Sequence, residues 1–225
     1  MWGPRARDLV QSVSENDFSH EAFPYLTAQQ VTIGDIPVLA LRVTYVGELG
    51  WEIYAPMEYG LKLWDTLWEA GQSRGIVAAG YRAIESLRLE KGYRYWSADI
   101  HSEYNPYEAG LGFAVKLKKG DFIGREALER IKAEGVTRKL CCLTLDDPRA
   151  VALGGEPLLD GARVLGRITS GGYGYTVRQS IAYGYLPVEY AIPDTLVEVQ
   201  LFGARYQATV MKEPLFDPKN EKIKV

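Results

Sequence analysis

The chain has 225 residues, 47 % of them hydrophobic, so it is long enough to bury the core of one large domain or two smaller ones. With 26 basic and 29 acidic residues its net charge is −3, which argues against a nucleic-acid partner, because such a partner selects a clustered basic excess. No apolar run approaches the roughly 20 residues that span a bilayer, and the start lacks the apolar segment of a secretory signal, so no membrane partner is expected.

The first part of the chain is predicted to combine helices and strands. Pro4 and the aliphatic residues after it predict a short helix over residues 4–14. Residues 30–45 are predicted to form a β-hairpin that turns at Gly34 and Asp35. Alternating large and polar side chains then predict a third strand over residues 51–55.

Two helices are predicted next, over residues 57–73 and 81–91. Leu61, Trp64 and Trp68 recur at helical spacing in the first of them, with further leucines beside them. We therefore expect both tryptophans to pack in the core rather than to form a stacking platform for a ligand.

The later part of the chain changes character. A short strand is predicted over residues 112–118 and a small helix over 125–133. Beyond them, strand-like segments alternate with turn signals, a rhythm typical of a small antiparallel barrel or sandwich. The turn signals are Asp160-Gly161, Gly171-Gly172, Pro187 and Phe202-Gly203. The predicted fold class is α+β, with an α+β domain over residues 1–136 and an antiparallel β-barrel domain over 137–225.

Cysteine and histidine usage predicts no metal centre. Cys141 and Cys142 are the only cysteines, and as neighbours in a predicted strand they point to opposite faces. We expect plain core thiols in a reducing compartment; a vicinal disulfide or a metal pair is the alternative, although two ligands do not make a zinc site. His20 and His101 match no metal or catalytic-triad spacing.

The segment Tyr45–Glu52, Y-V-G-E-L-G-W-E, is the strongest candidate for a binding loop. Two glycines bracket Glu48 between two predicted strands, so the backbone can bend sharply and approach a ligand closely. A carboxylate held this way can accept two parallel hydrogen bonds from an N–H/NH2 edge such as that of a 2-amino-pyrimidinone. On the residues alone, a solvated glutamate in a hairpin loop is the commoner arrangement.

Arg88 is a second candidate, because it borders the apolar face of its predicted helix. It can pair with Glu85, three residues earlier, or anchor an anionic ligand, and the helix ion pair is the commoner use. The glycine-rich segment Ile168–Thr176 lacks the ending of a P-loop and predicts a wide turn that another surface can approach closely. None of these candidates pairs a nucleophile with a base.

Short motifs that follow one another along the whole chain resemble the glycine cleavage T-protein (aminomethyltransferase) family. They are Gly3–Arg7, Tyr45–Glu52, Ser86–Lys91, Glu108–Gly112, Gly124–Leu128, Gly155–Leu158, Thr169–Gly172, Ala182–Tyr185 and Pro214–Pro218. Within that family, Gly92–Trp96 and Asp217–Glu221 are most similar to the C-terminal folate domain of sarcosine and dimethylglycine dehydrogenases.

The resemblance implies a tetrahydrofolate-binding domain for one-carbon transfer. In the dehydrogenase branch, an FAD domain fused upstream oxidises an N-methyl group, and the folate domain captures the carbon as 5,10-methylenetetrahydrofolate. The family glutamate that contacts the pterin corresponds to Glu48. Tyr45, Glu52, Arg82 and Arg88 are the other residues that the resemblance implies for binding the cofactor.

Two departures from the family pattern bear on activity. The family's catalytic aspartate lies upstream of the region that this chain matches, so no catalytic residue is expected here and the chain alone is expected to be inactive. Where T-proteins tend to have A-R-D, this sequence has Ala83-Ile84-Glu85. That departure favours the dehydrogenase branch and leaves open whether Arg82 or Arg88 replaces the missing arginine.

Other functions of the same fold stay open, namely a non-catalytic regulatory or interaction module and a glycine-cleavage aminomethyltransferase. The resemblance places the chain in a bacterial cytoplasm, or in the mitochondrial matrix of a eukaryote. Folate and one-carbon compounds are the expected ligands. Because a T-protein fold without its front half exposes apolar surface, self-association is also expected.

Overall fold

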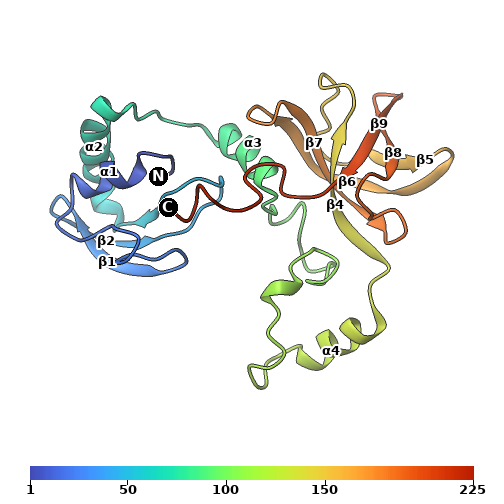
Figure 1. Cartoon of the computed structure of the whole chain (residues 1–225), viewed down its shortest axis with the longest axis horizontal. Coiled ribbons are helices and arrows are strands. Elements are labelled where there is room, and N and C mark those ends of the chain that lie inside the picture. Colours follow the sequence, from blue (N-terminus) through green and yellow to red (C-terminus); the bar gives the residue numbers. More distant parts are fainter. The chain divides into compact units, whose positions relative to one another are not determined.

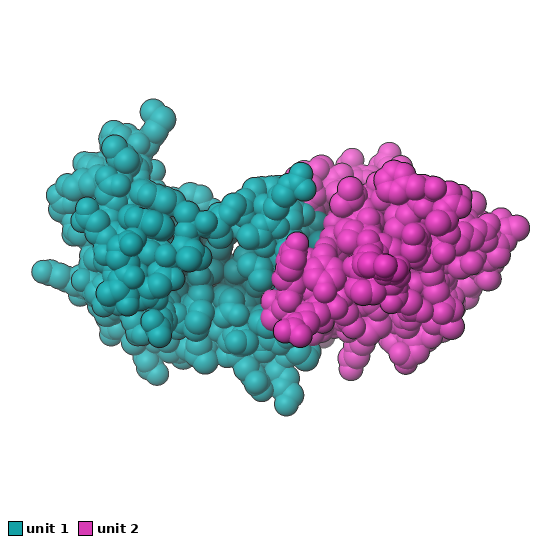
Figure 2. Space-filling model, turned by 90° about the horizontal axis from the view of Figure 1, so that it is seen from above, with its two compact units in different colours: residues 1–91, 216–225 teal, residues 92–215 magenta.

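The computed structural model describes all 225 residues, which form two compact units. Unit 1 comprises Met1–Lys91 and Phe216–Val225, and unit 2 comprises Gly92–Leu215, as coloured in Figure 2. Each unit has a hydrophobic core of its own. The predicted division after residue 136 falls inside unit 2, directly before the first barrel strand, and stays a prediction about domains.

Unit 1 is built on an antiparallel three-stranded sheet with α1 and α2 on one face (Figure 1). Its strands are β1 (Ala28–Ile33), β2 (Ile36–Leu41) and β3 (Glu52–Tyr54), in the order β1-β2-β3. Its helices are α1 (Ala6–Gln11), α2 (Gly60–Gly71) and α3 (Tyr81–Lys91), with 3-10 turns on either side of α2 at Met57–Tyr59 and Gln72–Arg74. The predicted hairpin, third strand and helices of this part are confirmed.

The core of unit 1 lies on one face of the sheet, because successive strand residues point to opposite faces. Trp51 is fully buried there, with Phe18 and Phe23 against it edge-on at ring-centroid distances of 5.2 and 6.0 Å. The buried residues of the sheet are Val31, Ile33, Ile36, Val38 and Ala40. The opposite face carries the exposed side chains of Leu39 and Tyr54.

The orientation of α2 differs from the prediction. Leu63 and Leu67 pack against the core, whereas Leu61 and Trp64 are 75 % and 55 % exposed. Trp64 stacks on the half-buried Trp68, with ring centroids 5.8 Å apart and planes inclined by 11°. The expectation of core packing for the tryptophan pair is wrong, because two stripes of this helix have helical spacing and only tertiary packing selects one of them.

Unit 2 contains a closed six-stranded antiparallel barrel, so the predicted barrel is confirmed. Its strands follow the order β4-β7-β6-β5-β8-β9 around the barrel. Their bounds are β4 (Arg138–Leu145), β5 (Pro157–Asp160), β6 (Arg163–Gly174), β7 (Gln179–Pro187), β8 (Leu196–Leu201) and β9 (Ala204–Met211). Closure leaves none of these strands with a free edge.

The glycines of β6 serve close packing rather than a turn. The predicted turn at Gly171-Gly172 is wrong, because β6 continues through both residues. A Cβ on Gly171 would lie 2.4 Å from the carbonyl oxygen of Ala152, and one on Gly166 would lie 2.2 Å from that of Tyr185. The close approach expected for this segment is therefore present, but between neighbouring parts of the barrel unit.

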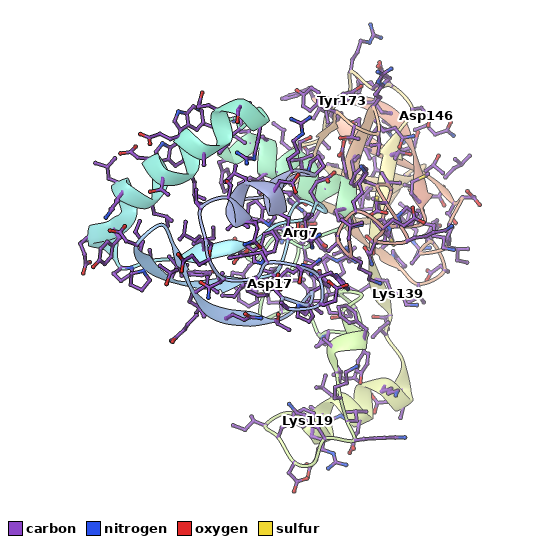
Figure 3. The ribbon with its side chains drawn as sticks, turned by 60° about the vertical axis from the view of Figure 1, so that its left-hand side comes forward. Arg7, Asp17, Lys119, Lys139, Asp146 and Tyr173 are labelled. Atoms are coloured by element: carbon purple, nitrogen blue, oxygen red, sulfur yellow. The ribbon has the colours of Figure 1, made fainter.

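Residues 92–137 precede the barrel in unit 2. The predicted helix over 125–133 is confirmed as α4 (Arg125–Glu134), and Lys119 lies in the loop before it (Figure 3). The predicted strand over 112–118 is wrong: a 3-10 turn occupies Gly112–Ala114, and backbone amides here bond to carbonyls three residues earlier.

No helix of the chain is both long and apolar enough to cross a membrane.

Cys141 and Cys142 are free thiols buried in β4, as expected. Burial raises the pKa of each thiol to about 12. Because the thiolate is the reactive form, neither residue is suited to act as a nucleophile.

Candidate functional site

The loop between β2 and β3 depends on its two glycines. Gly47 has a φ of +78°, and a Cβ there would lie 2.8 Å from the Lys91 side chain. A Cβ on Gly50 would lie 2.2 Å from the carbonyl oxygen of Met1. Thr44 Oγ1 accepts a hydrogen bond from the Gly47 amide at 3.0 Å. These contacts hold the loop in one sharp bend, as its glycine spacing predicts.

Glu48 projects from this bend with 22 % of its side chain exposed. Its carboxylate accepts no hydrogen bond from the protein, and the nearest cation, Lys222 Nζ, is 3.9 Å from Oε1. Burial raises the pKa of Glu48; Asp217 acts in the same direction, while Lys222 and Lys91 oppose it. A half-buried carboxylate without donors has acceptor capacity that a ligand can fill.

The C-terminal segment 216–223 adds residues to this site that the sequence analysis did not identify. The Phe216 amide donates to the carbonyl oxygen of Glu90 at 3.0 Å, and Lys91 Nζ donates to the carbonyl oxygen of Asp217 at 2.6 Å. The ammonium group of Lys91 lies 5.9 Å from the centroid of the Phe216 ring, and that of Lys222 lies 5.7 Å from it. Two lysines and two carboxylates thus gather where the end of α3 meets the loop.

Arg88 and Arg82 occupy different environments on α3. Arg88 is fully buried, and its Nη2 and Nε donate to Glu85 Oε2 at 3.0 and 3.2 Å, which confirms the predicted ion pair. The other oxygen of Glu85, Oε1, is buried without a partner. Arg88 precedes Lys91 by three residues and so lies on the side of α3 that meets the loop, whereas Arg82 is exposed.

Tyr45 and Glu52, the remaining candidate residues, lie at opposite ends of the segment. Tyr45 is half-buried in the same loop as Glu48. Glu52 belongs to β3, and its Oε2 accepts a hydrogen bond from the hydroxyl of Tyr54 at 2.7 Å. The structure therefore groups Glu48 and Tyr45 in one loop and leaves Glu52 with a partner of its own.

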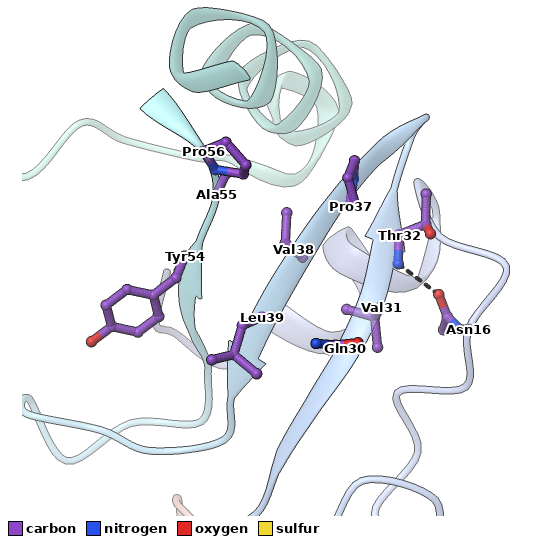
Figure 4. Close-up of a pocket in the computed structure, with 10 residues that line it drawn as sticks. All are labelled: Asn16, Gln30, Val31, Thr32, Pro37, Val38, Leu39, Tyr54, Ala55 and Pro56. Carbon is purple, nitrogen blue, oxygen red and sulfur yellow. Dashed lines mark hydrogen bonds between the residues drawn. The ribbon is translucent and has the colours of Figure 1, made fainter. Parts of the chain in front are cut away.

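A separate hollow of about 510 Å³ lies on the open face of the unit 1 sheet (Figure 4). Tyr54 is the only ionisable residue in its lining, and the Thr32 amide donates to Asn16 Oδ1 at 2.8 Å. The lining comprises Asn16, Gln30, Val31, Thr32, Pro37, Val38, Leu39, Tyr54, Ala55 and Pro56. Without a carboxylate or a basic side chain, this hollow is a poorer candidate for acid–base chemistry than the Glu48 loop.

Unit 2 holds a fully buried carboxylate, Asp99, that the sequence analysis also missed. Its Oδ1 accepts hydrogen bonds from Thr169 Oγ1 at 2.5 Å and Ser170 Oγ at 2.6 Å, and its Oδ2 accepts one from the Tyr95 amide at 2.9 Å. The protein itself supplies these donors, so Asp99 fixes the segment before it to β6. No local pattern marks this contact, because about 70 residues separate Asp99 from its hydroxyl donors.

The sequence matches two protein-family models. The GCVT N-terminal domain matches residues 1–119, and the glycine cleavage T-protein C-terminal barrel domain matches residues 138–217. Mitochondrial dimethylglycine dehydrogenase of Mus musculus is 42 % identical over 214 residues, which are 95 % of this chain and 25 % of the enzyme. Mitochondrial sarcosine dehydrogenase of the same organism is 40 % identical over 230 residues, covering 99 % of this chain and 25 % of the enzyme.

Aminomethyltransferases show a similar degree of likeness over more of their length. That of Symbiobacterium thermophilum is 40 % identical over 216 residues, covering 95 % of this chain and 57 % of the enzyme. The crystal structure of glycine cleavage system aminomethyltransferase T from Bartonella henselae matches with a TM-score of 0.86 at 27 % identity, over 96 % of this chain and 58 % of that one. The chain thus spans a quarter of the length of the dehydrogenases and less than two thirds of these aminomethyltransferases. It belongs to the glycine cleavage T-protein family.

Proposed function

We propose that this chain is the tetrahydrofolate-binding, one-carbon-transfer portion of a protein similar to sarcosine and dimethylglycine dehydrogenases. The observation that most supports the proposal is the Glu48 carboxylate, half-buried in a glycine-bracketed loop without a hydrogen-bond donor of its own. With 22 % of its side chain exposed, this carboxylate has lone pairs that a ligand with N–H donors can reach from solvent.

Glu48 binds the N–H/NH2 edge of the pterin in this proposal, because two parallel hydrogen bonds to a charged acceptor fix both position and orientation. Tyr45 shares the loop, and Arg88 lies on the side of α3 that meets it. Arg82 is exposed and Glu52 is bonded to Tyr54, so both suit the pterin site less well.

Tetrahydrofolate, when bound, supplies the amine nitrogens that take up the one-carbon unit as 5,10-methylenetetrahydrofolate. The residues of this chain contribute by orienting the cofactor, and orientation alone can supply much of a rate advantage. The iminium ion or formaldehyde from amine oxidation is lost in water, so a folate site on the same polypeptide as an FAD-dependent oxidising domain raises the effective concentration of the acceptor.

The dehydrogenase branch is preferred over a glycine-cleavage aminomethyltransferase because of Ala83-Ile84-Glu85. In this chain the acid of that triplet, Glu85, pairs with Arg88 three residues later in the sequence. A full-length protein of the dehydrogenase branch would convert sarcosine or dimethylglycine with folate-dependent product formation, whereas an aminomethyltransferase would leave both amines unchanged.

Isothermal titration of the full-length protein with tetrahydrofolate tests the binding site. Glu48→Gln should weaken binding about tenfold or more, since a hydrogen bond to a charged group contributes about 1.5–3 kcal/mol. Glu58→Gln removes the same charge from an exposed position of unit 1 and should leave the affinity unchanged. Equal affinity of wild type and Glu48→Gln would contradict the role of Glu48. No binding by the wild type would contradict the folate function and favour a non-catalytic interaction module.

A further inference from the structure

We propose that Lys222 is a positioning residue of the Glu48 site, which holds the Glu48 carboxylate in place for a ligand, so that the C-terminal segment 216–223 contributes to the site through Lys222. This inference rests on the proposed function and deepens it. Lys222 lies more than 170 residues from Glu48 in the sequence, and none of the motifs that identify the loop includes it.

The C-terminal segment is fixed in unit 1 at both of its ends. At its start, Phe216 and Asp217 are bonded to the last residues of α3. At its end, Ile223 is 2 % exposed, and its carbonyl oxygen accepts from Nη2 of the buried Arg42 at 3.5 Å. A segment held at both ends is a rigid support for the side chains between them.

Asp217 folds the middle of this segment back on itself. Its carboxylate accepts hydrogen bonds from the amides of Glu221 and Lys222 at 2.9 and 3.2 Å. Lys91 Nζ lies 3.3 Å from the same carboxylate. Asp217 thus fixes the backbone of Lys222, and its carboxylate forms an ion pair with the ammonium group of Lys91.

The side chain of Lys222 lies against both the Phe216 ring and Glu48. Its Nζ is 5.7 Å from the ring centroid and 3.9 Å from Glu48 Oε1. A cation is attracted to the face of an aromatic ring, so Phe216 helps to hold the ammonium. At 3.9 Å the contact with Glu48 is an attraction between charges and not a hydrogen bond, so it leaves the lone pairs of the carboxylate open to a ligand.

Of the lysines near Glu48, Lys222 has the larger effect on the pKa of the Glu48 carboxyl group. Burial and the nearby Asp217 both raise this pKa, and Lys222 and Lys91 oppose them. Without Lys222, Glu48 takes up a proton at a higher pH and carries an O–H donor where the ligand presents an N–H.

A carboxyl titration followed by NMR tests this role on the unliganded chain. In Lys222→Met the pKa of Glu48 should rise, whereas Lys222→Arg should keep it near the wild-type value. Lys219→Met removes a charge from an exposed position of the same segment and serves as the matched control. The same pKa of Glu48 in Lys222→Met and Lys219→Met would overturn the proposal.

Tetrahydrofolate titrations between pH 5.5 and 7.5 separate positioning from a structural role. Lys222→Met should lose affinity relative to wild type several-fold, and the loss should grow as the pH falls, because more of Glu48 is then protonated. A loss that is independent of pH, or an unfolded Lys222→Met beside a folded Lys222→Arg, would overturn the proposal in favour of a structural role. If the pKa of Glu48 shifts in Lys222→Met but the wild type does not bind tetrahydrofolate, the folate function is overturned. The effect of Lys222 on Glu48 is then still supported.

Discussion

In unit 2 every barrel strand has hydrogen-bonded neighbours on both sides, whereas in unit 1 the sheet is open and β1 and β3 each have one neighbour. The carboxylates of the two units differ in whether the protein donates hydrogen bonds to them. Asp99 in unit 2 receives its hydrogen bonds from the protein, and Glu48 in unit 1 receives none. Because a closed barrel satisfies its own groups, it is suited to be a scaffold. The open unit keeps carboxylate oxygens without a hydrogen-bond partner, on Glu48 and at Glu85 Oε1, and such acceptors are available to a ligand that brings donors.

Substitution of Gly171 by Ala gives the largest expected effect, because it tests how tightly the closed barrel is packed. The new Cβ would lie 2.4 Å from the carbonyl oxygen of Ala152, and a backbone atom cannot move aside cheaply. We expect a loss of about 2–4 kcal/mol in the free energy of unfolding, measured by urea denaturation. Gly60→Ala in α2 of the open unit meets nothing within 4 Å and should be neutral or stabilising by up to about 1 kcal/mol. Equal costs at the two positions would contradict the comparison.

The elements of both units could largely be predicted from sequence, because period and turn chemistry are local properties. The Gly34-Asp35 turn located the hairpin, the rhythm of turn signals indicated the barrel, and helical spacing located α3 at its observed bounds. The failures have a common physical cause. The face of α2, the path of β6 through Gly171 and the turn at Gly112 depend on what packs against them, which neighbours in sequence do not reveal.

The candidate site was predictable only in part for the same reason. The glycines around Glu48 predict a bent loop, and the spacing of Glu85 and Arg88 predicts their ion pair. Lys222 and Asp99, by contrast, reach their partners across distances in sequence that no local pattern covers. Residues that contact a site from a distant part of the sequence can be identified only once the fold is known.

Two leucines of α2 allow a sharper test of the open unit. Leu67 packs against the core and Leu61 is 75 % exposed, so the same change to Ala should have unequal costs. We expect Leu67→Ala to lower the free energy of unfolding by about 1–2 kcal/mol, since Leu67 is partly buried, and Leu61→Ala by less than about 0.5 kcal/mol. Urea denaturation of the two variants measures the difference. The reverse order would mean that the stripe containing Leu61 and Trp64 faces the core after all.

The pH dependence of stability gives the smallest expected effect. It distinguishes the carboxylate of Asp217, to which the protein donates hydrogen bonds, from that of Glu48, to which it donates none. Although burial acts in the other direction, hydrogen bonds from the amides of Glu221 and Lys222 and from Lys91 hold the pKa of Asp217 below its ordinary value of 3.8. Its contribution to stability is therefore present above pH 3.8 and is lost as the pH falls through the lower pKa of the folded state. Asp217→Asn should be less stable than wild type near neutral pH, and the difference should shrink in acid.

Glu48 has the opposite sign, because burial raises its pKa above the ordinary value of 4.5. The folded state then binds more protons than the unfolded state just above pH 4.5, so wild-type stability falls as the pH rises through that window. Glu48→Gln removes this penalty and should gain stability relative to wild type over the same window. Urea denaturation between pH 3 and 7 compares the two variants. Shifts of the same sign would show that Glu48, like Asp217, is held by the protein's own contacts, and would contradict the proposal that Glu48 is an acceptor for a ligand.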